Sequence, residues 1–289
     1  MPVSEQSPRQ GRILVVTDLS GVGRCAAMVA VPVISLSGSN CALLPTAVFS
    51  THTGGFGQVH RRDMTPDMKP ILAHWLDLGL RFDAVFVSYV ANERQLNLLE
   101  DALPSLLGTQ GKLYLDPVMG DHGRRYAFCG EALVEGFARL CRVADTIFPN
   151  RTEAALLMGV PLRAGEEPPP PAAEDILALG AKNAVVTGVR DETGQVGVMA
   201  AMFGSPDVYQ TFRKHYEGAY PGAGDLLASC IVSALALGAA LPRACDIACD
   251  FLDESLSHTA RYRIPSRFGL VFEQALPRLS RVFEALKPT

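Results

Sequence analysis

The sequence predicts an α/β fold of three layers, in which helices cover both faces of a mostly parallel central sheet. Two observations predict it. Short runs of branched apolar residues alternate with helix-like segments, an order typical of parallel strands joined by crossover helices. The apolar runs also end on polar residues at comparable positions. We place these strands at residues 12–18, 83–89, 112–117, 145–150 and 183–188.

Helices are expected between and after these strands, and an antiparallel hairpin is expected at the edge of the sheet. The extended run at 41–50 leads into a loop of hydroxyl, imidazole and glycine residues at 51–57. The hairpin comprises 195–203 and 208–214 around a turn of glycine, serine, proline and aspartate. The helices are expected near 25–36, 67–78, 92–106, 131–141, 152–158, 172–180, 225–238, 242–257 and 269–286.

Length and composition limit the class of protein. The chain has 289 residues, of which 48% are hydrophobic, enough for one large domain with a substantial core. We expect a single domain over 12–289, preceded by a disordered polar tail at 1–11. A net charge of −4 and a pI near 5.9 argue against nucleic acid as a partner. The apolar run at 226–241 is too short and too interrupted for a membrane span.

Cysteine usage indicates the compartment. The seven cysteines form an odd set without a C-x-x-C pair, and most lie within apolar runs. This pattern is typical of reduced core residues in a cytoplasmic protein. Cys245 and Cys249 have helical spacing, but no second ligand pair accompanies them, which argues against zinc.

Polar residues at the ends of the predicted strands predict a ligand site. In open parallel sheets, ligands bind beyond the carboxyl ends of the strands. The residues at those ends are Asp18, Tyr89, Asp116, Asn150 and Thr187. One such residue alone is usually a turn former, but several at equivalent positions predict a shared site.

A glycine-rich turn at 220–225 runs directly into an apolar helix. Gly222 and Gly224 let the backbone N–H groups face a ligand, and the helix start adds unpaired donors and a positive dipole end, which together suit a phosphate. Asp225 would repel a resting phosphate. We interpret it as the base for a hydroxyl that attacks that phosphate. The alternative is a turn whose aspartate caps a buried helix.

Phosphoryl transfer from ATP also needs a metal ion near the phosphates. The chain lacks the P-loop pattern G-x-x-x-x-G-K-[ST] and the protein-kinase motifs. Asp116 and Asp121 can hold Mg²⁺ directly or through water, because this ion prefers oxygen ligands. Asn150 and Glu153 can do so from the neighbouring strand. The alternative for Glu153 is a favourable charge at a helix N-terminus.

These motifs resemble the ribokinase-like superfamily and, within it, the pyridoxal/pyridoxamine (vitamin B6) kinases. D-P-V-M-G-D and P-N-x-x-E-A are shared with hydroxymethylpyrimidine kinases, whereas F-S-x-H-T points to vitamin B6. The resemblance runs from about Arg12 to Leu286. The matching segments are S-G-V-G-R-C-A-A at 20–27, L-P-T-A-V-F-S-T-H-T-G at 44–54, D-P-V-M-G-D at 116–121, P-N-R-T-E-A at 149–154, V-V-T at 185–187 and G-A-G-D at 222–225.

The resemblance implies an ATP- and Mg²⁺-dependent kinase, a homodimer, that phosphorylates the 5′-hydroxymethyl group of pyridoxal, pyridoxamine or pyridoxine. Asp225 would be the catalytic base, and Gly222, Ala223 and Gly224 would form the anion hole. Nucleotide and metal would lie among Asp116, Asp121, Tyr126, Asn150, Glu153 and Thr187, with Asp116, Asp121 and Glu153 closest to the metal. Asp18, Ser20, Thr53 and Tyr89 would bind the substrate.

Three departures from the family pattern bear on this interpretation. Ala223 stands where many B6 kinases have threonine, so the phosphate site lacks a hydroxyl. Phe148 precedes Pro149 where the family often has threonine, which argues against a monovalent-cation site there. Gly188 replaces a common serine.

Two alternatives stay open: a related kinase for hydroxymethylpyrimidine or a sugar, and a non-catalytic B6-binding protein. The sequence pattern does not distinguish the preferred vitamer, the need for a monovalent cation or the oligomeric state.

Overall fold

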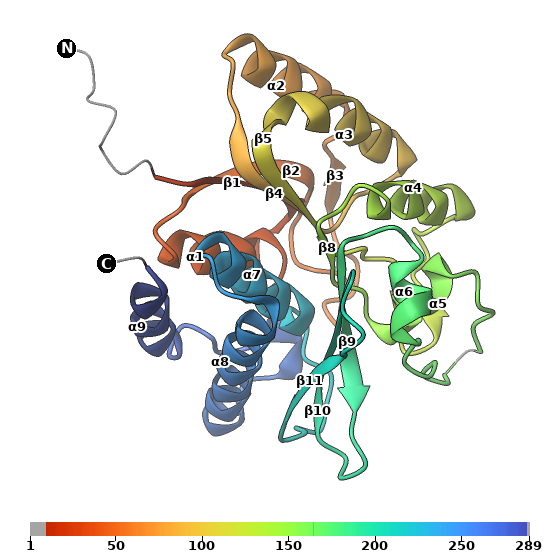
Figure 1. The fold of residues 1–289 in the computed structure, drawn as a ribbon, viewed down its shortest axis with the longest axis vertical. Helices are drawn as coiled ribbons and strands as arrows, with labels where there is room; N and C mark the ends of the chain where they lie inside the picture. The colour runs from red at the N-terminus through yellow and green to blue at the C-terminus, as the bar shows by residue number, and fades with distance from the viewer. Residues whose placement is uncertain (1–9, 164, 288–289) are drawn as a thin grey trace.

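A nine-stranded sheet forms the middle layer of the computed structural model, which describes residues 10–163 and 165–287 (Figure 1). The strand order is β11-β10-β9-β8-β5-β4-β1-β2-β3. From β9 to β2 all neighbours are parallel, whereas β10 and β11 at one edge and β3 at the other are antiparallel. The predicted parallel sheet and its edge hairpin are confirmed.

The strands of the large sheet are β1 (Arg12–Ser20), β2 (Asn40–Phe49), β3 (Arg61–Asp63), β4 (Phe82–Val87), β5 (Leu107–Leu115), β8 (Thr146–Ile147), β9 (Asn183–Arg190), β10 (Val196–Met202) and β11 (Tyr209–Arg213). A separate small hairpin consists of β6 (Gly120–Asp121) and β7 (Arg124–Arg125). This hairpin follows β5, so it lies beyond the carboxyl end of the central strands.

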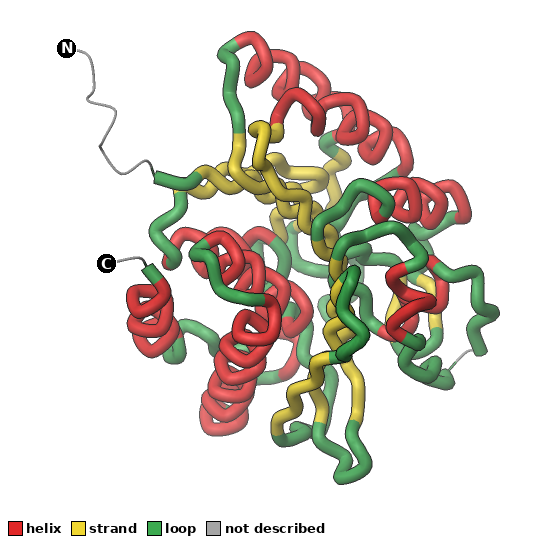
Figure 2. The backbone as a smooth tube through the Cα atoms, viewed as in Figure 1, coloured by secondary structure: helices red, strands yellow, loops and turns green. Residues whose placement is uncertain are grey.

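The helices are α1 (Ala27–Leu36), α2 (Thr65–Asp77), α3 (Glu93–Leu106), α4 (Glu131–Cys141), α5 (Arg151–Leu157), α6 (Ala173–Leu177), α7 (Ala223–Ala236), α8 (Leu241–Tyr262) and α9 (Leu276–Leu286). A short 3₁₀ turn, η1 (Ser266–Phe268), precedes α9. Figure 2 shows these helices on both sides of the strands.

Two hydrophobic clusters occupy the two faces of the sheet. One buries the apolar sides of α2 to α6, with Phe137 and Leu99 at its centre. The other buries α1, α7, α8 and α9, with Phe86 and Phe283 fully enclosed. The two groups of helices are separated by the sheet (Figure 1). Alternating side chains of the buried strands feed both clusters, which explains why these strands are apolar throughout.

Some predicted boundaries were wrong, each for a local reason. The strand expected at 145–150 pairs only at Thr146–Ile147 and then continues as loop, with one isolated bridge between Asn150 and Thr187. The last helix begins at Leu276, not near 269, because Gly269 takes a left-handed φ of +75° and lies against Arg24. Strand β3 was missed because its side chains are all polar and exposed.

Part of the predicted tail can be described. Residues 1–9 lie outside the described residues. The Gln10 side chain donates to the Gly38 carbonyl at 2.8 Å, and the Gly11 carbonyl accepts from the Asn40 N–H at 2.7 Å. All seven cysteines are free, and all but Cys41 are buried, as the sequence predicts. Within 10–163 and 165–287, no helix combines the length and apolar character needed to cross a bilayer.

Candidate active site

The glycine turn that begins α7 packs directly on the β1–α1 turn. Gly222 has a φ of +86°, and a Cβ there would lie 1.9 Å from the Arg24 carbonyl oxygen, so both conformation and space demand glycine. A Cβ at Gly224 would meet nothing within 4 Å. Open space therefore lies above the first turn of α7, whose N–H groups have no carbonyl before them in the helix.

Asp225, in that first turn, is fixed by a residue far away in the chain. Its carboxylate accepts a 2.8 Å hydrogen bond from the Ala26 N–H. Ala26 has φ 49° and ψ −131°, a conformation that favours glycine, so the backbone there is strained. Burial raises the pKa of Asp225, while the hydrogen bond from the Ala26 N–H and the nearby His52 oppose the rise. A half-buried carboxylate is thus held in place at a helix N-terminus.

Two further carboxylates face Asp225. Asp18 is 8% exposed and accepts a hydrogen bond from the Ser20 hydroxyl at 2.9 Å. Burial and the negative charge of Asp225 raise its pKa to about 7. Asp116 is also 8% exposed, and burial together with the charge of Asp225 raises its pKa. The hydroxyl of Ser88, which donates to Asp116 at 3.3 Å, opposes this rise. The structure brings these three predicted acids together at the carboxyl edge of the sheet.

Glu153 is tied into a capping box at the start of α5. Its carboxylate accepts from the Asn150 N–H at 2.8 Å and the Met119 N–H at 3.1 Å, while the Asn150 side chain accepts from the Glu153 N–H at 2.9 Å. The Asn150 amide donates to the Gly120 carbonyl at 2.8 Å. The helix-capping alternative for Glu153 is therefore present in the structure, together with a link to the segment after Asp116.

Asp116 and Glu153 nevertheless form a buried pair of like charges. Burial raises the pKa of Glu153 well above its usual range, and the charge of Asp116 adds to the rise. No hydrogen bond or ion pair from a lysine or arginine of the described chain reaches either carboxylate. Buried oxygen donors without a protein cation fit a divalent cation such as Mg²⁺.

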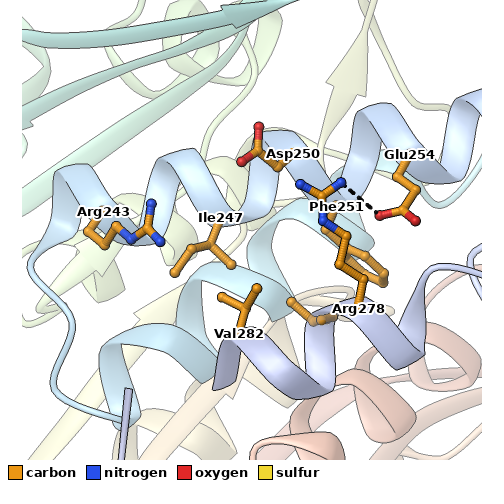
Figure 3. Close-up of a pocket in the computed structure, with 8 residues that line it drawn as sticks. Arg243, Ile247, Asp250, Phe251, Glu254, Arg278 and Val282 are labelled. Atoms are coloured by element: carbon orange, nitrogen blue, oxygen red, sulfur yellow. Dashed lines mark hydrogen bonds and ion pairs between the residues drawn. The ribbon is translucent and has the colours of Figure 1, made fainter. Parts of the chain in front are cut away.

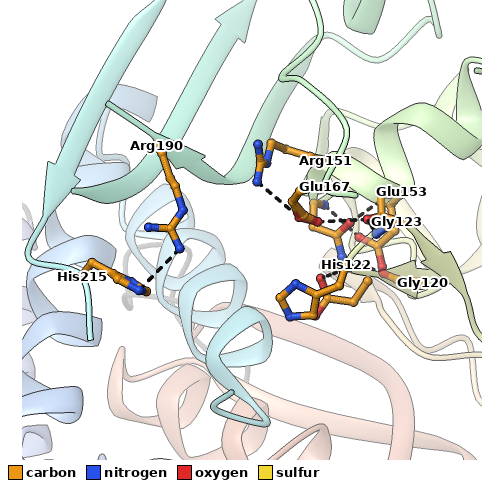
Figure 4. Close-up of polar contacts among 11 residues, drawn as sticks. Gly120, His122, Gly123, Arg151, Glu153, Glu167, Arg190 and His215 are labelled. Atoms are coloured by element: carbon orange, nitrogen blue, oxygen red, sulfur yellow. Dashed lines mark hydrogen bonds and ion pairs between the residues drawn. The ribbon is translucent and has the colours of Figure 1, made fainter. Parts of the chain in front are cut away.

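Asp121 lies in the β6–β7 hairpin and has other neighbours, of which Figure 4 labels His122 and Glu167. Ligand atoms of Asp121, His122 and Glu167 lie within 4.8 Å of one another. Glu167 also pairs with Arg151 at 3.3 Å and accepts from the Thr152 hydroxyl at 3.2 Å. Burial raises the pKa of Asp121, and the charge of His122 opposes this. No hydrogen bond connects Asp121 to Asp116 or Glu153 among the described residues. Its negative charge nevertheless adds to the raised pKa of Glu153.

Thr187 and Gly188 sit on a bulge of β9. The Thr187 N–H donates to the Pro149 carbonyl at 3.0 Å, which places Thr187 beside Asn150. The pairing with β10 shifts at this point, and Gly188 has a φ of +71°. Glycine therefore suits this position for its conformation.

Aromatic rings line the site beside Asp18. Tyr89 is buried and packs edge-on against Phe49 at 5.8 Å and Phe128 at 5.1 Å between ring centroids. Phe128 in turn stacks on Tyr126 at 5.7 Å. Burial raises the pKa of Tyr89 to about 12, and the charge of Arg61 opposes the rise while Asp18 adds to it. The wall therefore runs from the acids near Asp18 to Tyr126.

Tyr126 lies at the mouth of the acidic region. It is 40% exposed. Burial of its hydroxyl raises its pKa above the usual range, and the charges of Asp121, Glu153, Asp116 and Asp225 raise it further. The negative charges of these four acids therefore all act on the Tyr126 hydroxyl.

Hydrogen bonds of His52 hold the loop after β2 in place. Its buried ring accepts from the Gly54 N–H at 3.0 Å and lies 2.5 Å from the Arg267 carbonyl oxygen, which requires the proton on Nε2. A Cβ at Gly23 would strike the same ring. Thr53, next to it, is exposed, and within the described residues its side chain makes no hydrogen bond. The structure places Thr53 on this loop without joining it to Asp18, Ser20 or Tyr89.

Sequence reasoning missed several residues that support the site. Ala26 carries no chemistry in its side chain, so only its backbone geometry identifies it. Ser88 and Phe128 act through contacts with Asp116 and Tyr89. His122 and Glu167 are 45 positions apart, and only folding brings them to Asp121.

A separate hollow lies between α8 and α9 on the outer helical layer (Figure 3). Its walls include Arg243, Ile247, Phe251 and Val282, and an ion pair joins Arg278 to Glu254 at 3.3 Å. None of the predicted site residues lines this hollow, so it is separate from the candidate active site.

Comparison with known proteins defines the class of protein. A family model described as phosphomethylpyrimidine kinase matches residues 34–268. The chain belongs to this family. The solved pyridoxal kinase of Lactobacillus plantarum has a TM-score of 0.86 and 30% identity, covering 96% of this chain and 99% of that one. The sequence-based resemblance and the ribokinase-like fold are confirmed.

Two further relatives are informative. A Bacteroides thetaiotaomicron protein, provisionally named a phosphomethylpyrimidine kinase and crystallised with pyridoxal, has a TM-score of 0.86 and 30% identity over 94% of this chain and 96% of that one. A Schizosaccharomyces pombe relative, provisionally named a pyridoxal kinase, is 24% identical over 66% of this chain. The match spans 58% of the length of that relative.

Proposed function

We propose that this chain is a vitamin B6 kinase, which transfers the γ-phosphoryl group of ATP to the 5′-hydroxymethyl group of pyridoxal, pyridoxamine or pyridoxine. One observation carries the proposal. Asp225 is held by the Ala26 N–H at the open N-terminus of α7, where an acid and an anion cradle occupy the same turn. A helix cap alone needs no cradle, and a phosphate site alone needs no acid.

In the proposed reaction, the Asp225 carboxylate accepts the proton of the substrate hydroxyl. The hydroxyl oxygen forms a bond to the γ-phosphorus as the bond to the bridging oxygen of ADP breaks. The turn of Gly222, Ala223 and Gly224 would form the anion hole for the phosphoryl oxygens, although the Ala223 N–H donates to the Tyr220 carbonyl at 3.1 Å in this structure. Burial raises the pKa of Asp225, and a raised pKa makes its carboxylate a stronger base than an ordinary one.

The nucleotide is assigned to the acidic region between β5 and β9. Asp116, Asp121 and Glu153 would hold Mg²⁺, which supplies charge neutralisation at the phosphates when bound. Asn150 and Thr187 would flank the nucleotide, and Tyr126 would cover the phosphates from the mouth. Phe148 packs in the core against Phe86 and offers only its backbone carbonyl, so nothing beyond the family resemblance supports a monovalent-cation site there.

The substrate ring is assigned to the region of Asp18, Ser20 and Tyr89, and Thr53, on the loop after β2, would contact it as the family resemblance implies. Tyr89 and Phe49 provide an aromatic wall for a pyridine ring. Asp18, whose charge interacts with that of Asp225, would lie beside the reacting hydroxymethyl group. We further propose a cytoplasmic homodimer, on the cysteine usage and the family resemblance.

A second candidate is a hydroxymethylpyrimidine kinase. The family description, phosphomethylpyrimidine kinase, favours it, and both substrates carry a hydroxymethyl group on a six-membered heteroaromatic ring. The F-S-x-H-T segment at 49–53 favours the pyridine substrate.

The test is ADP release by the purified protein with MgATP and, separately, pyridoxal, pyridoxamine, pyridoxine, hydroxymethylpyrimidine and ribose. We expect turnover with at least one B6 vitamer, and kcat/KM for it at least about tenfold above that for the pyrimidine. Preference for the pyrimidine or ribose would replace the substrate and keep the fold. No turnover with any of them would favour a non-catalytic binding protein.

Asp225→Asn tests the catalytic assignment. The amide keeps an oxygen that can accept from the Ala26 N–H but is a poor base, so we expect kcat to fall about 1,000-fold. Binding of the B6 vitamer, measured by its absorbance or by calorimetry, should change less than about threefold. An unchanged kcat would disprove the role of Asp225.

A further inference from the structure

Strand β3 carries two neighbouring arginines that face opposite sides of the sheet edge. In the antiparallel ladder between β2 and β3, Arg61 lies opposite Phe49 and Arg62 lies opposite Val48. Directly opposite residues share one face of a sheet, and successive residues alternate. Phe49 is 6% exposed and packs in the aromatic wall, whereas Val48 is 37% exposed on the other face. Arg61 therefore faces the wall, and Arg62 faces away from it.

The Arg61 guanidinium lies over this wall. Its central carbon is 5.8 Å from the centroid of the Phe49 ring, and its charge acts on the hydroxyl of Tyr89. Within the described chain, no carboxylate lies at ion-pair distance from it. The nearby Asp63 is instead engaged by Thr65, Asn92 and Gln95. An exposed cation thus lies over the aromatic wall, and its hydrogen-bond donors have no acceptor among the described residues.

Charges of opposite sign therefore act on the aromatic wall. The carboxylates of Asp18, Asp116 and Asp225, which interact with one another, repel negative charge. Arg61, over the Phe49 ring, attracts it, and its effect on the Tyr89 hydroxyl is opposite in sign to that of Asp18. A ring whose hydroxymethyl group reaches Asp225 would place any anionic substituent on the side away from the acids.

B6 vitamers have such a substituent. Their 3-hydroxypyridine ring exists in water near neutral pH mainly as a zwitterion, with the negative charge on the 3-oxygen. Hydroxymethylpyrimidine has no ionised oxygen. An arginine can donate charge-assisted hydrogen bonds to the 3-oxygen, and these are stronger than neutral ones.

We propose that Arg61 is a specificity-determining residue that recognises the anionic 3-oxygen of a 3-hydroxypyridine substrate. This inference rests on the proposed B6 kinase function and names the feature of the substrate that the site selects. The rings of Phe49 and Tyr89 would contact any flat heteroaromatic ring, so Arg61 would supply the distinction between pyridine and pyrimidine substrates.

The experiment compares wild type, Arg61→Gln, Arg61→Lys and Arg62→Gln on three substrates: pyridoxine, its analogue lacking the 3-hydroxyl group, and hydroxymethylpyrimidine. Arg61→Gln should lower kcat/KM for pyridoxine about tenfold, mainly through KM, and change that for the analogue less than about twofold. Arg61→Lys should retain part of the preference because it keeps the charge. Arg62→Gln, the matched control on the opposite face, should behave as wild type.

Each result has one meaning. If wild type turns over pyridoxine and Arg61→Gln leaves the ratio between pyridoxine and its analogue unchanged, the inference is wrong and the kinase assignment stands. If wild type turns over no B6 vitamer, the proposed function fails and the inference fails with it. Thermal unfolding of Arg61→Gln within about 2 °C of wild type would show that a lost preference does not come from misfolding.

Discussion

Asp145 and Asp116 are buried to nearly the same extent and lie at opposite ends of the central strands, Asp145 at the amino end and Asp116 at the carboxyl end. Asp145 precedes β8 at the amino edge and accepts from Lys182 at 2.8 Å, Lys112 at 3.2 Å and the Leu113 N–H at 3.0 Å. Burial alone raises its pKa, but these bonds outweigh burial and lower it. Asp116 follows β5 at the carboxyl edge, has one hydroxyl partner, and its pKa is raised.

The difference shows that acids at one end of the strands stabilise the fold, whereas acids at the other end are arranged for binding. At the amino edge, the carboxylate is neutralised by lysines and contributes to folding. At the carboxyl edge, acids face one another without a protein cation, an arrangement that costs folding free energy and suits binding of an external cation. The following substitutions test that separation.

Asp116→Asn has the largest expected effect. It removes a proposed magnesium ligand while keeping an acceptor for Ser88, so kcat should fall about 100-fold. The free energy of unfolding at pH 8 should rise by about 1 kcal/mol, because a buried charge is removed. ADP release and urea denaturation measure the two changes. Activity within about threefold of wild type would contradict the metal assignment.

Asp145→Asn should show the opposite pattern. Loss of the lysine pairs should lower the free energy of unfolding by about 2 kcal/mol at pH 7, with kcat unchanged. The folded-state pKa is lowered, so this stability is present above the unfolded pKa of about 4 and is lost as pH falls through the folded value. Urea denaturation at pH 7 and at pH 3 should show a gap between variant and wild type that shrinks in acid.

Asp18→Asn tests the pH dependence at the carboxyl edge. The folded pKa, about 7, lies above the unfolded value, so the contribution of Asp18 is fully favourable below about pH 4 and is lost as pH rises through 7. The variant should therefore be more stable than wild type by about 1–2 kcal/mol at pH 8.5 and nearly equal at pH 4. An equal difference at both pH values would show that burial of charge at Asp18 is not the cause.

Ala26→Gly has the smallest expected effect. Glycine adopts the positive φ of this position without strain and keeps the N–H that holds Asp225. The free energy of unfolding should rise by about 0.5 kcal/mol, since relief of strain exceeds the added flexibility of the unfolded chain. The value of kcat/KM should stay within about twofold. A tenfold loss of activity would mean that the alanine methyl itself supports the site.

The rule that ligands bind beyond the carboxyl ends of parallel strands predicted from the sequence that Asp116 follows β5 and Asn150 follows β8, because parallel strands end together. Asp18 and Thr187 lie inside the observed strands, since β1 continues to Ser20 and β9 to Arg190. The sequence pattern also predicted the parallel sheet, since strand and helix alternate regularly. It could not predict β3, where Arg61, Arg62 and Asp63 carry no apolar signal.

Contacts between segments far apart in the chain could not be predicted from the sequence either. The Ala26–Asp225 bond and the grouping of Asp121 with Glu167 depend on chain packing that no local pattern encodes. The roles of Tyr126 and Thr53 rest on family resemblance and stay predictions.

The contact between the turns at Arg24 and Gly222 determines when the site can form as the chain is synthesised. The Ala26–Asp225 bond joins residues 199 positions apart, and the pair of Arg24 with Glu273 spans 249 positions. A nascent chain leaving the ribosome can form its early strands but lacks Asp225, the proposed base, until the last quarter of the protein emerges. Because contacts of such long sequence separation form late, the site should assemble near the end of folding, which leaves incomplete chains unable to consume ATP.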